Sequence, residues 1–219
     1  MQIAIDGPAG AGKSTVARAV ASALGYKYID TGAMYRALGV ALGRRGVDTK
    51  QRDDVLEALA DVKIHVFFRG DKQVTAVDGH EAADEIRTAS AALAASDIAV
   101  FPEVRARLVE LQRELARNYD VVMDGRDIAS VVLPEADFKF YLTASPRARA
   151  ERRHRDLLKL GRDVDVDSIE AEIDERDRQD MNRKAAPLVR TAEQVLIDTT
   201  GMTQQEAVDK MLSVIRTSA

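Results

Sequence analysis

Short apolar runs alternate with helical patterns along this chain of 219 residues. The runs are rich in β-branched and aromatic residues and end in polar ones, which is typical of strands buried on both faces of a parallel sheet. They cover residues 2–6, 27–30, 120–124, 138–142 and 194–198. Segments with apolar residues at helical spacing lie between these runs. Examples are residues 14–24, which are followed by Gly25, and residues 102–117. The pattern predicts a three-layer α/β fold with one five-stranded parallel sheet.

One stretch interrupts this alternation. Residues 62–68 and 73–77 have strand patterns, a turn is expected at 69–71, and a second turn at Asp78-Gly79. They predict a small antiparallel hairpin or meander inserted between the second and third strands of the main sheet. His65 falls in this hairpin, where we expect a packed or solvent-facing side chain rather than a ligand.

The composition narrows the class of protein. With 24.0 kDa, 46% hydrophobic residues and no cysteine, the chain is expected to form one domain without disulfides, thiol catalysis or cysteinyl metal sites. No apolar run approaches the roughly 18 residues of a membrane span, and the N-terminus lacks the features of a targeting segment. We therefore expect a cytoplasmic protein whose fold begins at the first residue.

The net charge of −4 argues against a broad surface for nucleic-acid polymers, so any anion site must be local. Most of the 32 basic residues are arginine. Genome base composition can explain this excess, and so can a need for planar guanidinium groups that bind phosphate through two bonds.

A glycine-rich loop directly after the first strand carries the clearest chemistry. It satisfies G-x-x-x-x-G-K-[ST], the phosphate loop of nucleotide-binding proteins, in which backbone N–H groups and a helix N-terminus bind phosphate oxygens. Lys13 is expected to reach the β- and γ-phosphates of ATP, and Ser14 to ligate Mg²⁺. The predicted ATP-binding residues are Gly7, Pro8, Ala9, Gly10, Ala11, Gly12, Lys13, Ser14 and Thr15.

Two further segments follow predicted strands. After the second strand, Thr31 is expected to cap a helix that carries Tyr35 and Arg36, and Arg36 either holds an acceptor phosphate or is an ordinary surface residue. After the third, Asp124 stands where phosphate-loop proteins keep a carboxylate associated with Mg²⁺, which we expect to act through water. Arg126 and Asp127 follow it, as ligand-binding residues at a sheet edge or as a simple ion pair.

The stretch 145–183 is dense in charge and poor in apolar residues. Arg149, Arg152 and Arg153 share one predicted helix face, and Arg176, Asp180 and Arg183 share another. Such a segment is usually a solvated face with salt bridges, but beside a phosphate loop it favours a mobile lid that brings arginine to the transferring phosphoryl group.

The acceptor class follows by exclusion and by resemblance. The chain has no Asn-Lys pair of the kind that GTPases use for guanine, and little chain remains for the machinery of mechanical ATPases, so a small kinase is favoured. The blocks IDGPAGAGKST, DTGAMYR, FPEVR, DGRDIAS and RDRQDMNR with APL resemble, in order and over nearly the full length, those of bacterial cytidylate kinases, a P-loop nucleoside monophosphate kinase family.

This resemblance implies a P-loop kinase domain over 1–219, with a nucleotide-monophosphate-binding insertion at 31–100, its hairpin at about 62–79, and a helical lid at 145–185. It implies Mg²⁺-dependent transfer of the γ-phosphoryl group of ATP to CMP or dCMP by an expected monomer. The residues implied to bind CMP are Thr31, Tyr35, Arg36, Ser96, Arg105, Arg126, Asp127, Arg176, Asp180 and Arg183. The expected catalytic residues are Lys13, Arg126, Arg149, Arg153 and Arg183, with Arg149 or Arg153 at the transition state.

Two positions depart from the pattern of the family. Ala129-Ser130 stands where Gly-Thr is frequent, and Thr31 where Ser is frequent. A kinase for another small substrate and a non-enzymatic nucleotide-binding regulator remain as competing hypotheses.

Overall fold

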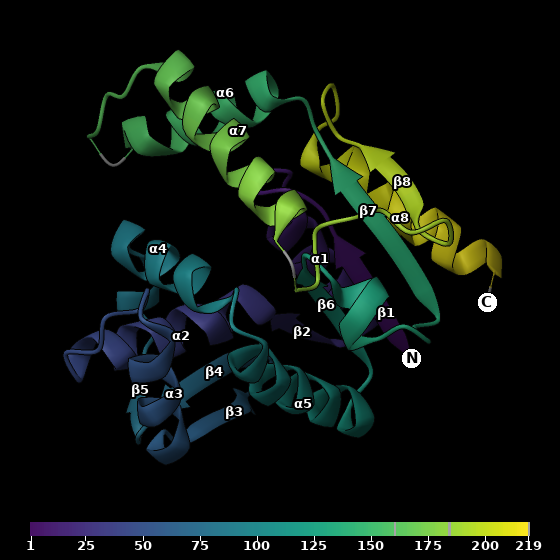
Figure 1. Ribbon diagram of the computed structural model, residues 1–219. Coiled ribbons are helices and arrows are strands. Elements are labelled where there is room, and N and C mark those ends of the chain that lie inside the picture. The colour runs from purple at the N-terminus through teal and green to yellow at the C-terminus, as the bar shows by residue number, and fades with distance from the viewer. Residues whose placement is uncertain (160, 184, 219) are drawn as a thin grey trace. The chain divides into compact units, whose positions relative to one another are not determined.

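The computed structural model describes residues 1–159, 161–183 and 185–218 (Figure 1). Its contacts divide the chain into two compact units. The first comprises 1–26 and 121–219, and the second comprises 27–120. The insertion at 31–100 and the lid at 145–185 stay predictions.

A five-stranded parallel sheet is the centre of the α/β architecture, as the sequence predicts. Its order is β2-β6-β1-β7-β8, formed by β2 (Lys27–Asp30), β6 (Val121–Gly125), β1 (Gln2–Asp6), β7 (Phe138–Thr143) and β8 (Val195–Asp198). In the register, Asp6 lies opposite Gly125 on one side and Tyr141 on the other. The loops that leave the carboxyl ends of these strands therefore start from one edge of the sheet.

Burial explains why these segments form strands. Ile3, Ala4 and Ile5 of β1 are fully buried, as is the apolar part of β6, so neither strand has a polar face. Three strands differ by one residue from the sequence prediction. β6 begins at Val121 and includes Gly125, and β7 extends to Thr143. β8 begins after Gln194, whose buried side chain bonds within the core instead.

Helices α1 (Lys13–Leu24) and α8 (Gln204–Ser218) pack against each other, and a π-helical turn, η2 (Ile128–Val132), follows β6. Gly25 closes α1 at a φ of 72°, in the left-handed region that favours glycine. Among the described residues, no helix combines the length and the apolar character needed to cross a membrane.

Helices α6 (Pro146–Lys159) and α7 (Val166–Asn182) lie side by side and form a helical pair (Figure 1). They share a small core of Ala150, Ile169 and Ile173. The two isoleucines lie one turn apart in the first half of α7. In its second half, which carries Arg176 and Asp180, the buried residue is Asp177, in agreement with the scarcity of apolar residues in the sequence.

The second unit contains the predicted insertion. An antiparallel sheet is formed by β3 (Ile64–Arg69), β4 (Lys72–Val77) and β5 (His80–Glu81), with turns at Gly70 and at Asp78-Gly79. His65 is exposed on β3. Around this sheet are α2 (Thr31–Arg44), α3 (Arg52–Asp61), η1 (Glu85–Arg87), α4 (Ala89–Ile98) and α5 (Pro102–Asn118). The core of the unit includes Met34, Leu38 and Leu108.

Helices α2 and α4 approach each other closely. A Cβ atom at Gly39 would lie 2.8 Å from the Cβ of Ala94, so a larger residue would force the two helices apart. This close packing fixes the helix that carries Tyr35 and Arg36 against the helix that carries Ser96.

Candidate nucleotide site

The phosphate loop runs from the end of β1 to the start of α1. Gly7, Gly10 and Gly12 have φ values of 147°, 76° and 85°, which glycine adopts without strain. Gly7 is further constrained, because a Cβ atom there would lie 1.9 Å from the carbonyl oxygen of Leu142. The loop therefore passes directly over β7 and delivers Lys13 as the first residue of a helix, whose N-terminus favours an anion.

Lys13 is buried, and its ammonium donates to the carbonyl oxygen of Pro8 at 2.7 Å. Burial is the main cause that lowers the pKa of Lys13 to about 7, and the nearby charge of Arg126 adds to it, while three aspartates act in the opposite direction. A phosphate group beside Lys13 would restore the ammonium form.

Binding of ATP should therefore take up a proton. At pH 8 a lysine with a pKa of about 7 is mostly neutral, so nucleotide binding is expected to bring up to about one proton onto Lys13, and none at pH 5.5. Titration calorimetry in two buffers of different ionisation enthalpy measures this uptake. Heats that do not depend on the buffer at pH 8 would contradict it, and Lys13→Met is the matched variant in which the uptake should vanish.

The same pKa predicts how the free protein responds to pH. The folded state favours neutral Lys13, so charged Lys13 destabilises the fold below about pH 7. Between pH 7 and the ordinary lysine pKa, the unfolded chain binds this proton and the folded chain does not, so this group makes stability rise with pH.

Ser14 and Asp124 form the second feature of the loop. The Ser14 hydroxyl donates to Asp124 Oδ2 at 2.9 Å, and Asp124 is buried at the end of β6. A hydroxyl and a carboxylate are hard oxygen ligands of the kind Mg²⁺ prefers, and that ion usually completes its shell with phosphate oxygens and water. Within the described residues there is no group of three acidic, histidine or cysteine side chains that could hold a metal by itself. The pair therefore fits an Mg²⁺ ion that arrives with a nucleotide.

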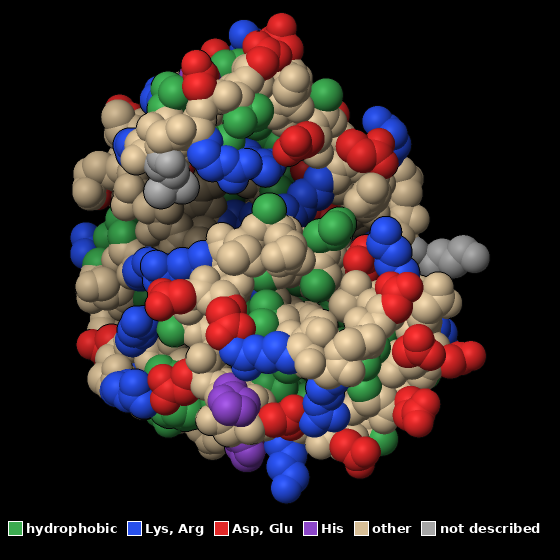
Figure 2. Space-filling view, turned by 90° about the vertical axis from the view of Figure 1, so that its left-hand side faces the viewer, with side chains coloured by type: hydrophobic (Ala, Val, Ile, Leu, Met, Phe, Trp, Pro, Cys, Tyr) green, Lys and Arg blue, Asp and Glu red, His purple; other side chains and the backbone are tan. Residues whose placement is uncertain are grey.

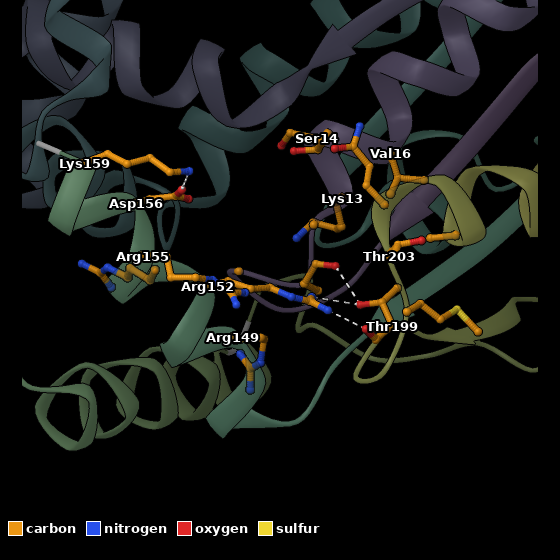
Figure 3. Close-up of a pocket in the computed structure, with 18 residues that line it drawn as sticks. Lys13, Ser14, Val16, Arg149, Arg152, Arg155, Asp156, Lys159, Thr199 and Thr203 are labelled. Atoms are coloured by element: carbon orange, nitrogen blue, oxygen red, sulfur yellow. Dashed lines mark hydrogen bonds and ion pairs between the residues drawn. The ribbon is translucent and has the colours of Figure 1, made fainter.

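A cavity of about 560 Å³ opens beside the loop (Figure 3). This volume suits a small molecule such as a nucleotide. In Figure 3, Lys13 and Ser14 come from the start of α1, and Arg152 and Arg155 come from α6. The residues that line the cavity are Gly10, Ala11, Gly12, Lys13, Ser14, Thr15, Val16, Arg149, Arg152, Arg153, Arg155, Asp156, Lys159, Thr199, Met202, Thr203, Gln204 and Ala207.

The predicted lid arginines line this cavity but have different partners. Arg152 donates to Thr199 Oγ1 at 3.1 Å, and that hydroxyl donates to the carbonyl of Ala11 at 3.3 Å, which fixes Arg152 to the floor of the cavity. Arg153 is half exposed and forms a 3.3 Å ion pair with Glu172. Arg149 is buried, and each of its three guanidinium nitrogens bonds to another group of the protein. Of the three, Arg153 is the one that can move toward a nucleotide at small cost, since exposed ion pairs are weak.

Arg126 and Asp180 form a second charged cluster in the same unit. Arg126 Nε donates to Asp180 Oδ2 at 2.7 Å. Burial acts to lower the pKa of Arg126, but Asp180 and other aspartates outweigh it and raise this pKa. Burial likewise acts to raise the pKa of Asp180, but the charge and hydrogen bond of Arg126, together with the charges of Arg183 and Arg176, outweigh it and lower that pKa. Both groups are therefore charged in this partly buried place.

Arg183 and Asp127 complete this cluster. Arg183 Nη2 lies 3.5 Å from Asp127 Oδ1, and Arg183 Nη1 lies 3.9 Å from Asp180 Oδ1. Only 9% of the Arg183 side chain is exposed. The prediction that Arg183 shares a helix face with Arg176 was wrong, because α7 ends at Asn182 and Arg183 is extended. It reaches Asp180 because the chain turns there, where Arg183 Nε also donates to the carbonyl of Ala186.

Asp6 is a buried carboxylate beside the phosphate loop that the motifs did not single out. It is buried at the end of β1 and accepts from the backbone N–H groups of Ile128 and Ala129 at 2.7 and 2.9 Å, and from the amide of Gln194 at 2.9 Å. Burial raises its pKa to about 6 despite these bonds. Asp6 thereby fixes the segment that begins at Arg126. In the sequence, Asp6 could have been noticed as an acidic residue at the end of an otherwise apolar strand.

The second unit brings together part of the predicted acceptor site. Arg105 is buried, and its guanidinium lies 5.9 Å from the centre of the Tyr35 ring. Arg36 forms an ion pair with Asp30 at 3.0 Å. Thr31 is buried, and Ser96 is partly buried on α4.

One prediction about this unit was wrong. The residue that caps α2 is Asp30, whose carboxylate accepts from the N–H of Ala33 at 2.8 Å, while Thr31 is the first helical residue. Asp30 also binds Arg36, one and a half turns later. Its acidic side chain therefore serves both the helix end and the predicted phosphate-binding arginine.

On the face in Figure 2, Lys and Arg side chains are interspersed with Asp and Glu over the part of the chain that is described. This agrees with a local rather than a broad anion site.

The fold and the phosphate loop together define a nucleotide-binding protein of the P-loop α/β class. Among solved structures, the chain is similar to an uncharacterized protein from Eubacterium ventriosum ATCC 27560, with a TM-score of 0.55, 12% identity, and 99% of this chain and 98% of that one covered. It is also similar to shikimate kinase from Bacteroides thetaiotaomicron, with a TM-score of 0.50, 13% identity and coverage of 99% and 98%. At these identities the likeness concerns the fold alone.

Sequence comparison identifies the family. The profile described as Cytidylate kinase matches residues 3–217. Cytidylate kinase from Symbiobacterium thermophilum is 48% identical over 213 residues, 96% of this chain and 93% of that protein. Cytidylate kinase from Pelotomaculum thermopropionicum is 48% identical over 219 residues, 99% of this chain and 96% of that protein. The chain belongs to the cytidylate kinase family, whose members are nucleoside monophosphate kinases.

Proposed function

We propose that this enzyme transfers the γ-phosphoryl group of ATP to CMP or dCMP and yields ADP with CDP or dCDP. The observation that carries the proposal is the match of the cytidylate kinase profile over residues 3–217. The phosphate loop and the two guanidinium groups of Arg126 and Arg183 support it, because they would supply a donor site and two charged donors for a second phosphate.

The chemistry needs no base from the protein. An oxygen of the CMP phosphate attacks the γ-phosphorus, and the bond to the bridging β–γ oxygen breaks to release ADP. The second pKa of a phosphomonoester is near 6, so the attacking oxygen is already largely anionic at neutral pH. The protein then contributes alignment, neutralisation of charge on the transferring group, and exclusion of water.

On the donor side, we assign phosphate binding to the backbone of the loop and to Lys13. Ser14 would hold Mg²⁺ directly and Asp124 through water, and the ion would neutralise charge on the phosphate oxygens. The 2.9 Å contact between Ser14 and Asp124 supports this pairing. Arg153 is our candidate for the transferring phosphoryl group, because it lines the cavity and its exposed ion pair is easily exchanged.

On the acceptor side, we assign the CMP phosphate to Arg36, Arg126 and Arg183, and the ribose and its neighbouring phosphate to Arg176 and Asp180. Thr31 and Tyr35 would line the site. The burial of Arg126 and Arg183 supports these roles, since a guanidinium in a dry site binds a phosphate more strongly than one in water.

Cytosine would be read by Ser96, Arg105 and Asp127. Asp127 can accept from the N4 amino group, while Arg105 and Ser96 can donate to N3 and O2. Uracil presents O4 and N3–H instead, which leaves Asp127 facing an acceptor. The contact of Arg105 with the Tyr35 ring supports the role of Arg105, because it limits where the guanidinium points.

The deciding experiment is a coupled assay of ADP release with a panel of monophosphates. CMP and dCMP should be turned over well and UMP poorly. Equal turnover of UMP would contradict the base assignment, turnover of an unrelated acceptor would indicate another kinase, and release that no acceptor stimulates would indicate a nucleotide-binding regulator. The cytoplasmic location and the monomeric state are parts of the same proposal, and sedimentation of the purified protein tests the latter.

Replacement of Arg36 by lysine is expected to raise the KM for CMP by about tenfold with little change in the KM for ATP. Lysine keeps the charge but loses the planar pair of donors, and with them one bond to a charged partner. Arg44→Lys on the same helix is the control, because Arg44 is exposed and pairs with Glu85. An unchanged KM for CMP would remove Arg36 from the acceptor site.

A further inference from the structure

Arg149 lies in the first turn of α6 and is only 3% exposed. Its guanidinium has three fixed partners: Nε donates to the carbonyl of Ala144 at 3.0 Å, Nη1 donates to the carbonyl of Ala9 at 3.0 Å, and Nη2 lies 2.6 Å from Asp177 Oδ2. Every nitrogen of the group is engaged by the protein. To bind a phosphoryl group, Arg149 would have to break bonds in a buried place.

The stem of Arg149 contacts the phosphate loop as well. A Cβ atom at Gly10 would lie 3.2 Å from the Cβ of Arg149 and 3.6 Å from its Cγ. Arg149 thus packs on Gly10 with its aliphatic part and binds Ala9 with its head. Two consecutive residues of the loop are held by one side chain that belongs to α6.

Asp177 orients that side chain from α7. It is 8% exposed, and among the described residues its Oδ1 is buried without a hydrogen-bond partner. The ion pair with Arg149 therefore compensates most of the cost of burying this carboxylate. Carboxylates left uncompensated in a buried place are strongly destabilising. Asp177 also lies one helical turn before Asp180, which binds Arg126.

We propose that Arg149, oriented by Asp177, is a positioning residue that holds the Ala9–Gly10 segment of the phosphate loop in the form that binds the donor's β-phosphate. The inference rests on the proposed function, in that it assumes that the loop binds ATP and ADP. In this proposal Arg149 acts through the phosphate loop, and it does not contact the transferring phosphoryl group at the transition state.

ADP binding separates the two roles, because ADP lacks the transferring group but uses the loop. Arg149→Met keeps the stem against Gly10 and removes the three bonds. We expect it to weaken ADP binding by calorimetry by about tenfold or more and to raise the KM for ATP, with a KM for CMP that changes less. A lowered kcat with wild-type ADP affinity would overturn the proposal and return Arg149 to the transition state.

A second variant separates positioning from stability. Arg149→Met leaves Asp177 as a buried, unpaired carboxylate, so Asp177→Asn in the same chain should recover the thermal midpoint. The weak ADP binding should persist in this double variant, because Ala9 still lacks its donor. Recovery of ADP affinity together with stability would show a merely structural role and overturn the proposal.

Arg147→Met is the matched control. Arg147 comes from the same helix and pairs with Asp167 and Glu170 of α7, but on the exposed surface. It should leave ADP affinity and both KM values unchanged, and a loss equal to that of Arg149→Met would overturn the proposal. Failure of the wild-type protein to bind ADP or ATP at all would instead refute the proposed function.

Discussion

Lys13→Met is expected to lower kcat/KM for ATP by about 10³-fold, which is the size of effect seen when one preorganised donor to a developing charge is lost. The helix α1 delivers the ammonium to the phosphate loop, where it bonds to the carbonyl of Pro8 at 2.7 Å. ATP would replace this partner by phosphate oxygens. Methionine fills a similar volume but cannot donate.

The fold should survive this change. Because burial lowers the pKa of Lys13 to about 7, the charged side chain is a cost to the free protein, and the neutral methionine should keep or raise the thermal midpoint. Lys139→Met is the control, because Lys139 also has a mostly buried stem but pairs with Glu193 outside the cavity. Transfer at the wild-type rate in Lys13→Met, measured by coupled ADP release, would refute the phosphate-loop assignment.

Arg126→Met is expected to lower kcat/KM for CMP by about 10³-fold, the lower end of what an arginine contributes in phosphoryl transfer. Arg126 lies directly after β6, partly buried, and is aligned by its 2.7 Å bond to Asp180. Its charge would hold the acceptor phosphate in line with the donor.

A double variant distinguishes lost catalysis from lost stability. Arg126→Met removes the closest cation of Asp180 among the described residues and leaves Arg183 at 3.9 Å and the charge of Arg176, so it should lower the thermal midpoint. Adding Asp180→Asn should restore the midpoint but not the activity. Arg178→Met, an exposed residue of α7 paired with Glu175, should be active and stable. If Arg126→Met binds and phosphorylates CMP normally, Arg126 has no role in the acceptor site.

The fold was predictable because its signals are local. Each strand of the main sheet is an apolar run between polar residues, so the pattern identified the five strands, with limits that differ by no more than a residue or two. The hairpin was predictable from its turns, where Gly70 and Asp78-Gly79 adopt positive φ. The cap of α2 was not, since Asp30 and Thr31 are both good caps and only the backbone decides between them.

The candidate nucleotide site was predictable where its residues belong to one continuous motif. The phosphate loop needs only consecutive residues and a following helix, so Lys13 and Ser14 could be identified from spacing. The partner of Ser14 could be anticipated only because Asp124 ends a neighbouring strand, and the 2.9 Å contact depends on the order of strands in the sheet.

The sequence by itself determined the α/β class, the phosphate loop and the resemblance that the family comparison confirmed, because these depend on short-range patterns. Only the tertiary structure decided how the many arginines differ. Arg149, Arg152 and Arg153 share one predicted helix face in the sequence. In the structure Arg149 is buried between Ala9 and Asp177, Arg152 is bound to Thr199, and Arg153 is half exposed. The physical reason is that the environment of a charge is set by groups far away in the chain, which spacing does not encode.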